Sequence, residues 1–497
     1  MSIRLRPQNQ RILFGLKLRQ LRLERDLSFQ QLAKLTGMSV SYLNEIEKGK
    51  KSPKTEKLQE LARALDVQLD ELTDPTLEAA MMPVVDLLRS NFLNELPLER
   101  FGIELTKVVE IIASAPARVG AFITSLLELS RNYALLDENF YKGALRSWLE
   151  MQENYLEDSE AFAKTLRRQL DWDPAYVPTA EDLAQILRRR YDYRIVPGGL
   201  DEEAAFTGLE RVYIHTDRSL LLAGSLGQRE LRYHLAEEIG YQEMSLTERS
   251  DVAPLVRVPS FNIALAHASA RAFAGALLLP TQQVDSELRD FFSANEVALD
   301  VFERFVDKYK VSPTVLFDRV AALLPRFLKI RSLYFIELTE SKAGEITITR
   351  ELHLGARHRP HATGLLEHYC RRWVGSRLLL RKRPGVQTGV QLSQFAGQDE
   401  EYIVIALADT SHDGLRRSVF LGTPLTPELE GRIPSLLKGN VPRRVVNNTC
   451  ERCAITDCAE RAAPPTVVAM RQQQQAIRQA VEERHRRARQ AARRGRI

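Results

Sequence analysis

The chain of 497 residues has only four cysteines and contains no run of 18 or more uncharged apolar residues. So few cysteines exclude a disulfide-stapled secreted framework and predict a reducing, cytoplasmic location. The most apolar segment, residues 258–280, is interrupted by His267 and Arg271, so we expect no transmembrane span and no membrane partner. The first eleven residues, MSIRLRPQNQR, lack the apolar stretch of a secretory signal.

The net charge of +5 is unevenly distributed along the chain. Residues 1–75 carry 14 Lys/Arg against 10 Asp/Glu, and residues 471–497 carry nine Arg against two Glu. The body between these ends is therefore mildly acidic. Basic ends can neutralise phosphates, although a solvated run of charge explains the C-terminal tail equally well. The length predicts about three domains of ordinary globular size.

Residues 11–73 predict a compact run of short helices. Ser28 begins a capping box, Gly37 ends the helix that follows, and Ser39 caps the next helix. We expect the inward side chains of these two helices to be Leu32, Ala33, Leu35, Leu43 and Ile46. Two helices joined by a tight turn form the helix-turn-helix plan, in which the second helix enters the DNA major groove.

The segment LRQLRLERDLSFQQLAKLTGMSVSYLNEIEKGKKSP resembles the phage-repressor-like helix-turn-helix regulators. An alternative interpretation is a small helical bundle that binds protein. The resemblance implies double-stranded DNA as the partner, with a set of contacts from the second helix and the residues after it. Val40, Ser41 and Asn44 would touch base edges, Tyr42 would lie at the edge of the same face, and Ser39, Lys48 and Lys50 would hold phosphates.

The helix LRYHLAEEIGYQ resembles the zinc-binding helix of metallopeptidases, in which two histidines hold the metal and a glutamate polarises water. Glu238 matches the catalytic acid, but Glu237 and Tyr241 occupy the two histidine positions. His267 lies near the place of the third, acidic ligand. Tyrosinate is a poor zinc ligand at neutral pH, so the resemblance implies the fold of a metallopeptidase without its activity.

Three cysteines, Cys450, Cys453 and Cys458, lie in one loop where their sulfurs can converge on a single metal centre. Thiolates are soft ligands that suit zinc or an iron–sulfur cluster. A fourth ligand could be Cys370, 80 residues away, or an external group. The alternatives are three reduced cysteines in a tight loop or a redox pair.

The order of these parts resembles the short-chain fatty acyl transcriptional regulators, which control propionate and acetate utilisation. The resemblance rests on Cys450-x-x-Cys453, Asp457-Cys458 and the run at 461–465, and on Cys370-Arg-Arg-Trp373. It implies an acyl-CoA effector and an iron–sulfur cluster, with zinc as the alternative. The match is loose over 330–440 and does not include the Arg-rich tail.

The sequence therefore predicts an α+β multidomain protein that is a homodimeric, non-enzymatic DNA-binding regulator, either a repressor or an activator. Alternative functions are a regulator with peptidase activity and an antitoxin-like protein acting on a protein partner. The predicted regions are an all-α helix-turn-helix domain at 1–75, a helical linker and dimerisation region at 76–175, a degenerate metallopeptidase-like α+β domain at 176–328, a mixed α/β sensor domain at 329–445, a Cys-rich loop at 446–466 and an Arg-rich tail at 467–497.

Overall fold

The computed structural model of the protein has two compact units, described separately here. One unit comprises Met1–Leu145 with Arg257–Ala264, and the other comprises Arg146–Val256 with Leu265–Ile497. The fold is α+β and multidomain, as the sequence predicts. Most of the predicted linker and dimerisation region, between 74 and 136, lies outside the described residues. The described residues are 7–73, 102, 103, 107, 137–253, 258, 260–294, 299–355, 367–411, 414–433 and 441–494.

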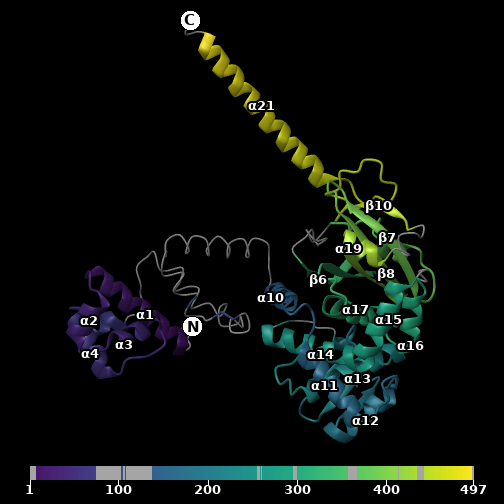
Figure 1. Ribbon diagram of the computed structural model, residues 1–497, viewed down its shortest axis with the longest axis horizontal. Coiled ribbons are helices and arrows are strands. Elements are labelled where there is room, and N and C mark those ends of the chain that lie inside the picture. The colour runs from purple at the N-terminus through teal and green to yellow at the C-terminus, as the bar shows by residue number, and fades with distance from the viewer. Residues whose placement is uncertain are drawn as a thin grey trace. The chain divides into compact units, whose positions relative to one another are not determined.

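The N-terminal domain, purple in Figure 1, consists of short helices whose ends are set by local sequence signals. Its helices are α1 (Pro7–Glu24), α2 (Phe29–Thr36), α3 (Val40–Glu47), α4 (Thr55–Ala64) and α5 (Leu69–Thr73). Ser28 and Gln31 form the predicted capping box of α2, and Gly37 ends that helix with φ of 66°. Ser39 caps α3 as predicted, accepting the Tyr42 N–H. The turn between α2 and α3 is therefore specified by residues within it.

The core of this domain contains most of the side chains that the sequence places there. Leu32, Leu43 and Ile46 are fully buried, whereas Leu35, which we expected to face inward, is 59% exposed. The buried stripe of α2 continues from Leu32 to Thr36 instead, and the Thr36 hydroxyl donates to the Leu32 carbonyl. A polar residue satisfied within its own helix can thus occupy the inward position.

Helix α1 crosses the end of α3 at very close range. A Cβ at Gly15 would lie 2.5 Å from the carbonyl oxygens of both Ile46 and Glu47, so the crossing requires glycine. Farther along α1, the buried Arg22 forms a two-pronged ion pair with Glu47, with Nε–Oε1 and Nη2–Oε2 distances of 2.6 and 3.1 Å. These two contacts hold α3 at a defined position on α1, with its opposite face outward.

The central part of the second unit is a helical layer around a small sheet. The sheet order is β1-β3-β2-β4, with β1 at Arg194–Pro197, β2 at Arg211–Ile214, β3 at Ser219–Leu222 and β4 at Val252–Ala253. The apolar runs 212–214 and 220–222, which the sequence pattern predicts to be paired short strands, form the antiparallel β2–β3 hairpin. The helices between 137 and 327 are α10 (Asp137–Met151), α11 (Glu157–Gln169), α12 (Ala180–Tyr191), α13 (Gln228–Glu243), α14 (Phe261–Leu278), α15 (Thr281–Ser293), α16 (Val301–Tyr309) and α17 (Pro313–Phe327), with a short 3₁₀ turn at Ala204–Phe206.

The following part of the same unit is a six-stranded sheet of order β10-β7-β8-β9-β5-β6. The sequence pattern predicts five strands between 330 and 425, at 333–338, 346–348, 389–392, 402–407 and 418–421, and all five lie in strands of this sheet. The elements are β5 (Leu333–Glu340), β6 (Ile346–Leu354), α18 (Val374–Leu380), β7 (Gln387–Phe395), β8 (Glu401–Thr410), β9 (Arg416–Pro424), α19 (Pro427–Arg432), β10 (Arg443–Val446) and α21 (Thr466–Arg494). A single hydrophobic cluster continues from the helical layer into this sheet.

Helix α14 is the one helix among the described residues that is long and apolar enough, by length and composition, to cross a membrane. Of its apolar window, 61% is buried inside the protein. Ala270, Phe273 and Leu277 of this helix are fully buried. The apolar character of α14 is accounted for by its place in the core.

Candidate DNA-binding and cysteine sites

The residues expected to read DNA lie on the outward face of α3 and at its first turn. Val40 is 43% exposed, Ser39 and Ser41 are exposed, and Tyr42 and Asn44 are half-buried. The Ser39 hydroxyl oxygen accepts the Tyr42 N–H at 3.2 Å, so this oxygen caps the helix while the hydroxyl proton is left for another acceptor. The face thus combines short polar side chains with the positive end of the helix dipole.

The lysines after α3 are arranged by a tight turn. Gly49, with φ of 66°, lies so close to Ile12 that a Cβ would be 2.8 Å from its Cγ1 atom. Lys48 is half-buried at the end of the helix, and Lys50 is exposed after the turn. Both are placed at the rim of the α3 face, where the phosphates of a bound duplex would run.

Lys51 is a neighbour that the expected set of contacts did not include. Its Nζ atom is 2.7 Å from Glu45 Oε2 and 5.9 Å from the ring centre of Tyr42. The hydrogen bond to Glu45 raises the Lys51 pKa. Lys51 is thus paired with an acidic residue of α3 and covers one face of Tyr42.

The central domain contains a buried charge network at the metallopeptidase-like helix α13. Arg211 on β2 is completely buried and forms ion pairs with both Glu237 and Glu238. Glu238 is held further by Arg249 Nη2 at 2.7 Å and by the Tyr193 hydroxyl at 3.0 Å. The guanidinium of Arg211 therefore supplies positive charge to the carboxylates of Glu237 and Glu238. Both oxygens of Glu238, the residue that matches the catalytic acid in sequence, are engaged in hydrogen bonds.

The residues at the zinc-ligand positions belong to the same network. Tyr241 Oη is 3.1 Å from His267 Nδ1, which is 3.4 Å from Glu237 Oε1. His234 lies between two carboxylates, with Nδ1 3.4 Å from Glu237 Oε2 and Nε2 3.0 Å from Glu210 Oε2. The sequence pattern had singled out four of these residues, but it had not indicated Arg211 or Arg249.

Burial and pairing shift the pKa values in this network in opposite directions. Burial lowers the pKa of His267 to about 3, so its imidazole is neutral at physiological pH. Burial alone would raise the Glu237 pKa, but the attraction of Arg211 and the hydrogen bond of His234 bring it well below its usual range. Burial would lower the His234 pKa, but its bonds to Glu210 and Glu237 raise it.

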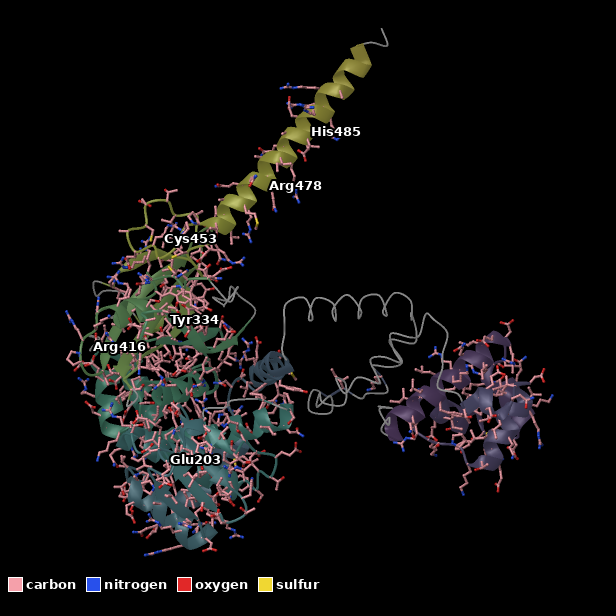
Figure 2. The ribbon with its side chains drawn as sticks, turned by 180° about the vertical axis from the view of Figure 1, so that it is seen from behind. Glu203, Tyr334, Arg416, Cys453, Arg478 and His485 are labelled. Atoms are coloured by element: carbon pink, nitrogen blue, oxygen red, sulfur yellow. The ribbon has the colours of Figure 1, made fainter. Side chains whose placement is uncertain are left out.

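The four cysteines line one small cavity in the C-terminal part of the second unit. Cys370, Cys450 and Cys453 are buried and Cys458 is half-buried, and all four are free thiols. Figure 2 places Cys453 between the sheet and helix α21. The cavity is lined by Cys370, Arg371, Arg372, Thr449, Cys450, Cys453, Ile455, Cys458, Glu460 and Arg461.

A short backbone pairing brings Cys370 to the other three cysteines. Tyr369 forms an antiparallel bridge with Thr449. On either side of the bridge, the Cys450 N–H donates to the His368 carbonyl at 2.8 Å, and the Cys370 N–H donates to the Asn448 carbonyl at 3.0 Å. Cys370, whose role as a fourth ligand the sequence leaves open, thus lies next to the loop that carries the other three cysteines.

Arg461 organises the loop that carries the cysteines. Its guanidinium donates to the carbonyls of Cys450 at 2.8 Å and Cys453 at 3.1 Å, and also to that of Ile455. The next residue, Ala462, donates its backbone N–H to Cys450 Sγ at 3.3 Å. The Arg-Ala part of the sequence signature therefore shapes the loop and hydrogen-bonds a sulfur.

The donor chemistry of this cavity fits a thiophilic metal ion or an iron–sulfur cluster, because four cysteines line it and a backbone N–H donates to the sulfur of one of them. Among the described residues, no group of three or more His, Cys, Asp or Glu side chains is arranged so that it could hold a metal ion. Burial, with the neighbouring Cys450 and Cys453 thiols, raises the Cys370 pKa to about 11. The four cysteines thus line one cavity, and the thiols would have to move closer together to bind an ion.

Five basic residues between 371 and 382 could meet the phosphates of an acyl-CoA, and they are divided between two places. Arg371 and Arg372 line the cysteine cavity. Arg377 Nη1 is 3.7 Å from Glu460 Oε1, whereas Arg381 and Lys382 are exposed after α18. Only the first pair adjoins the cysteines directly.

Comparison with known proteins identifies the N-terminal domain. Residues 18–72 match the HTH_3 family, described as helix-turn-helix. A solved structure of a Mycobacterium tuberculosis transcriptional regulator is similar over 65% of this chain and 94% of that chain, with a TM-score of 0.45 and 20% sequence identity. None of the curated proteins matches the chain.

The match and the geometry of α3 define the class of protein. Residues 18–72 form a helix-turn-helix domain, as the sequence predicts, and this domain makes the chain a DNA-binding protein. The individual base and phosphate contacts, the metal centre and the effector remain predictions.

Proposed function

We propose that this protein regulates genes of short-chain fatty acid metabolism, for propionate or acetate, in response to an acyl-CoA or redox signal. The observation that carries the DNA-binding part is the exposed polar face of α3 on a matched helix-turn-helix domain. The metabolic part is supported by the C-terminal signature around Cys450, Cys453 and Cys458. One helix-turn-helix reads one half-site, so a homodimer would supply the second recognition helix about one helical turn away.

The cysteine cavity is the proposed place of the signal. Cys370, Cys450, Cys453 and Cys458 would hold an iron–sulfur cluster, with zinc as the alternative. A cluster would supply reversible one-electron redox chemistry at this site. Such a centre would tie the loop between Cys450 and Cys458 to the segment that carries Cys370. This link would stiffen the start of α21.

We also propose that the central domain does not catalyse. A working peptidase needs Glu238 free to take a proton from a metal-bound water. Here Arg211, Arg249 and Tyr193 engage its oxygens, and the buried guanidinium of Arg211 opposes entry of a second cation. These contacts favour a structural role over the peptidase alternative.

Substitutions on the DNA-facing surface test the proposal. Asn44→Ala is expected to weaken binding to an operator selected from random duplexes by about 1–3 kcal/mol, with little effect on non-specific DNA. Lys50→Ala should weaken both and reduce the salt slope by about one unit, because it removes one phosphate contact. Fluorescence anisotropy across a salt series measures both effects. Lys164→Ala, which removes an exposed lysine of α11, is the control, and an unchanged footprint for Asn44→Ala would contradict the assignment of α3.

The effector is tested separately. Propionyl-CoA is expected to change operator affinity about fivefold or more, the usual scale of allosteric coupling, whereas free CoA should have less effect. Replacing both Arg371 and Arg372 by Gln should reduce this response if their charges meet the CoA phosphates beside the cavity. Anisotropy with propionyl-CoA, acetyl-CoA and free CoA measures the response. Operator affinity that none of the three alters would reject acyl-CoA sensing while leaving DNA binding intact.

A further inference from the structure

Helix α21 begins against the cysteine loop and then continues without cover. The N–H groups of Val467 and Val468 both donate to the Glu451 carbonyl, at 3.0 and 3.3 Å. From 469 to 488 every residue except Glu483 is exposed. Figures 1 and 2 show a single helix leaving the sheet, and Figure 2 labels Arg478 and His485 on its exposed length. Burial in the core therefore does not explain why this helix is present.

The charge on α21 is concentrated at its far end. The helix contains eight arginines and two glutamates, and residues 484–494 contain six arginines and no acidic residue. Glu483 pairs with Arg486 and, at 2.9 Å, with Arg487, and all three lie at the surface. Exposed pairs of this kind contribute little stability, so these arginines can exchange Glu483 for another anion at small cost.

The composition of the far end separates the candidate partners. The exposed large apolar side chains of α21 are Met470, Ile477 and Val481, all before the arginine cluster. Residues 484–494 contain only Arg, His, Gln and Ala. A helix that lies on a membrane needs an apolar face with large side chains, which this segment lacks. Binding to a polyanion whose charges are regularly spaced does not require such an apolar face.

We propose that residues 484–494 of α21 form a second DNA contact, which binds backbone phosphates without reading sequence. Eleven helical residues span about 16 Å, over which duplex DNA presents phosphates at about one per 1.7 Å of its axis. The arginines thus have several phosphates within their length. Because the helix-turn-helix domain already holds the chain on DNA, the second contact is effectively intramolecular and gains from the high local concentration.

The test uses the full-length protein with Arg484, Arg486 and Arg487 all replaced by Gln. Its binding to a random-sequence duplex of about 60 base pairs is followed by anisotropy from low to moderate salt. We expect the slope of log K against log salt to fall by about two to three units, and the affinity at low salt to fall about tenfold or more. The same substitutions to Lys should retain most of the slope, because phosphate binding needs the charge and not the guanidinium shape.

The matched control replaces Arg188, Arg189 and Arg190, which lie exposed in the last turn of α12, and so removes the same charge elsewhere. If it lowers the slope as much as the α21 variant does, net charge alone is responsible and the proposal is overturned. An unchanged slope for the α21 variant also overturns it, as does binding of α21 to vesicles of anionic lipid with no contribution to DNA binding. Lys50→Ala in the same assay, which should lower the slope by about one unit, keeps this outcome distinct from a failure of the helix-turn-helix assignment.

Discussion

Arg211→Met is expected to destabilise the central domain by about 3–5 kcal/mol, because it leaves the carboxylates of Glu237 and Glu238 buried with one cation fewer. Arg211 and Glu238 are both fully buried, and Glu237 is nearly so. Methionine has a similar length and no charge, so the change removes the ion pairs while keeping most of the volume. Urea unfolding followed by circular dichroism measures the loss.

Two further variants show whether the charge itself is responsible. Arg194→Met, at an exposed arginine of the same sheet, should change stability by less than about 0.5 kcal/mol. Adding Glu237→Gln to Arg211→Met should recover part of the loss, because an amide is less costly to bury than an unpaired carboxylate. If the free energy of unfolding of Arg211→Met equals that of the native protein, the buried ion pairs do not stabilise the fold.

Cys453→Ser is expected to abolish metal or cluster binding. Protein purified without oxygen should be brown, with visible absorbance that dithionite or oxygen bleaches, and the variant should be colourless with no iron or sulfide. The physical reason is that Cys453 is a buried donor in the cavity that all four cysteines line. Loss of the centre should also lower the melting temperature of the second unit while leaving the helix-turn-helix domain folded, because that domain has its own hydrophobic core.

Cys370→Ser separates the two possibilities for the fourth ligand. Loss of the centre would identify Cys370 as a ligand, and its persistence would mean that the fourth place is taken by an external group. Ala454→Ser, in the same loop, is a control that adds a hydroxyl without removing a thiol. A colourless protein with one tightly held zinc would replace the redox interpretation with a structural one. A protein with neither metal, and with unchanged stability in Cys453→Ser, would remove the metal hypothesis.

The helix-turn-helix domain was predictable because its determinants act over a few residues. The Ser28 capping box, the left-handed Gly37 and the Ser39 cap each fix a helix end through neighbours at most three positions away. The strands of the large sheet were predictable for a related reason, since β-branched and aromatic runs bounded by turn residues mark them locally. Leu35 shows the limit of periodicity, because Thr36 takes the inward position by bonding to its own helix.

Local pattern placed the recognition helix, the paired strands and the cysteine loop in this chain, whereas the chemistry around them depends on residues that meet only after folding. Arg211 lies 26 and 27 positions along the chain from its partners Glu237 and Glu238. Because arginine side chains are usually exposed, nothing in the sequence indicates that this one is completely buried. Cys370 reaches the cysteine loop through the bridge between Tyr369 and Thr449. Helix caps and strand patterns are short-range effects, but the burial of charge and the gathering of four cysteines around one cavity depend on which distant segments pack together.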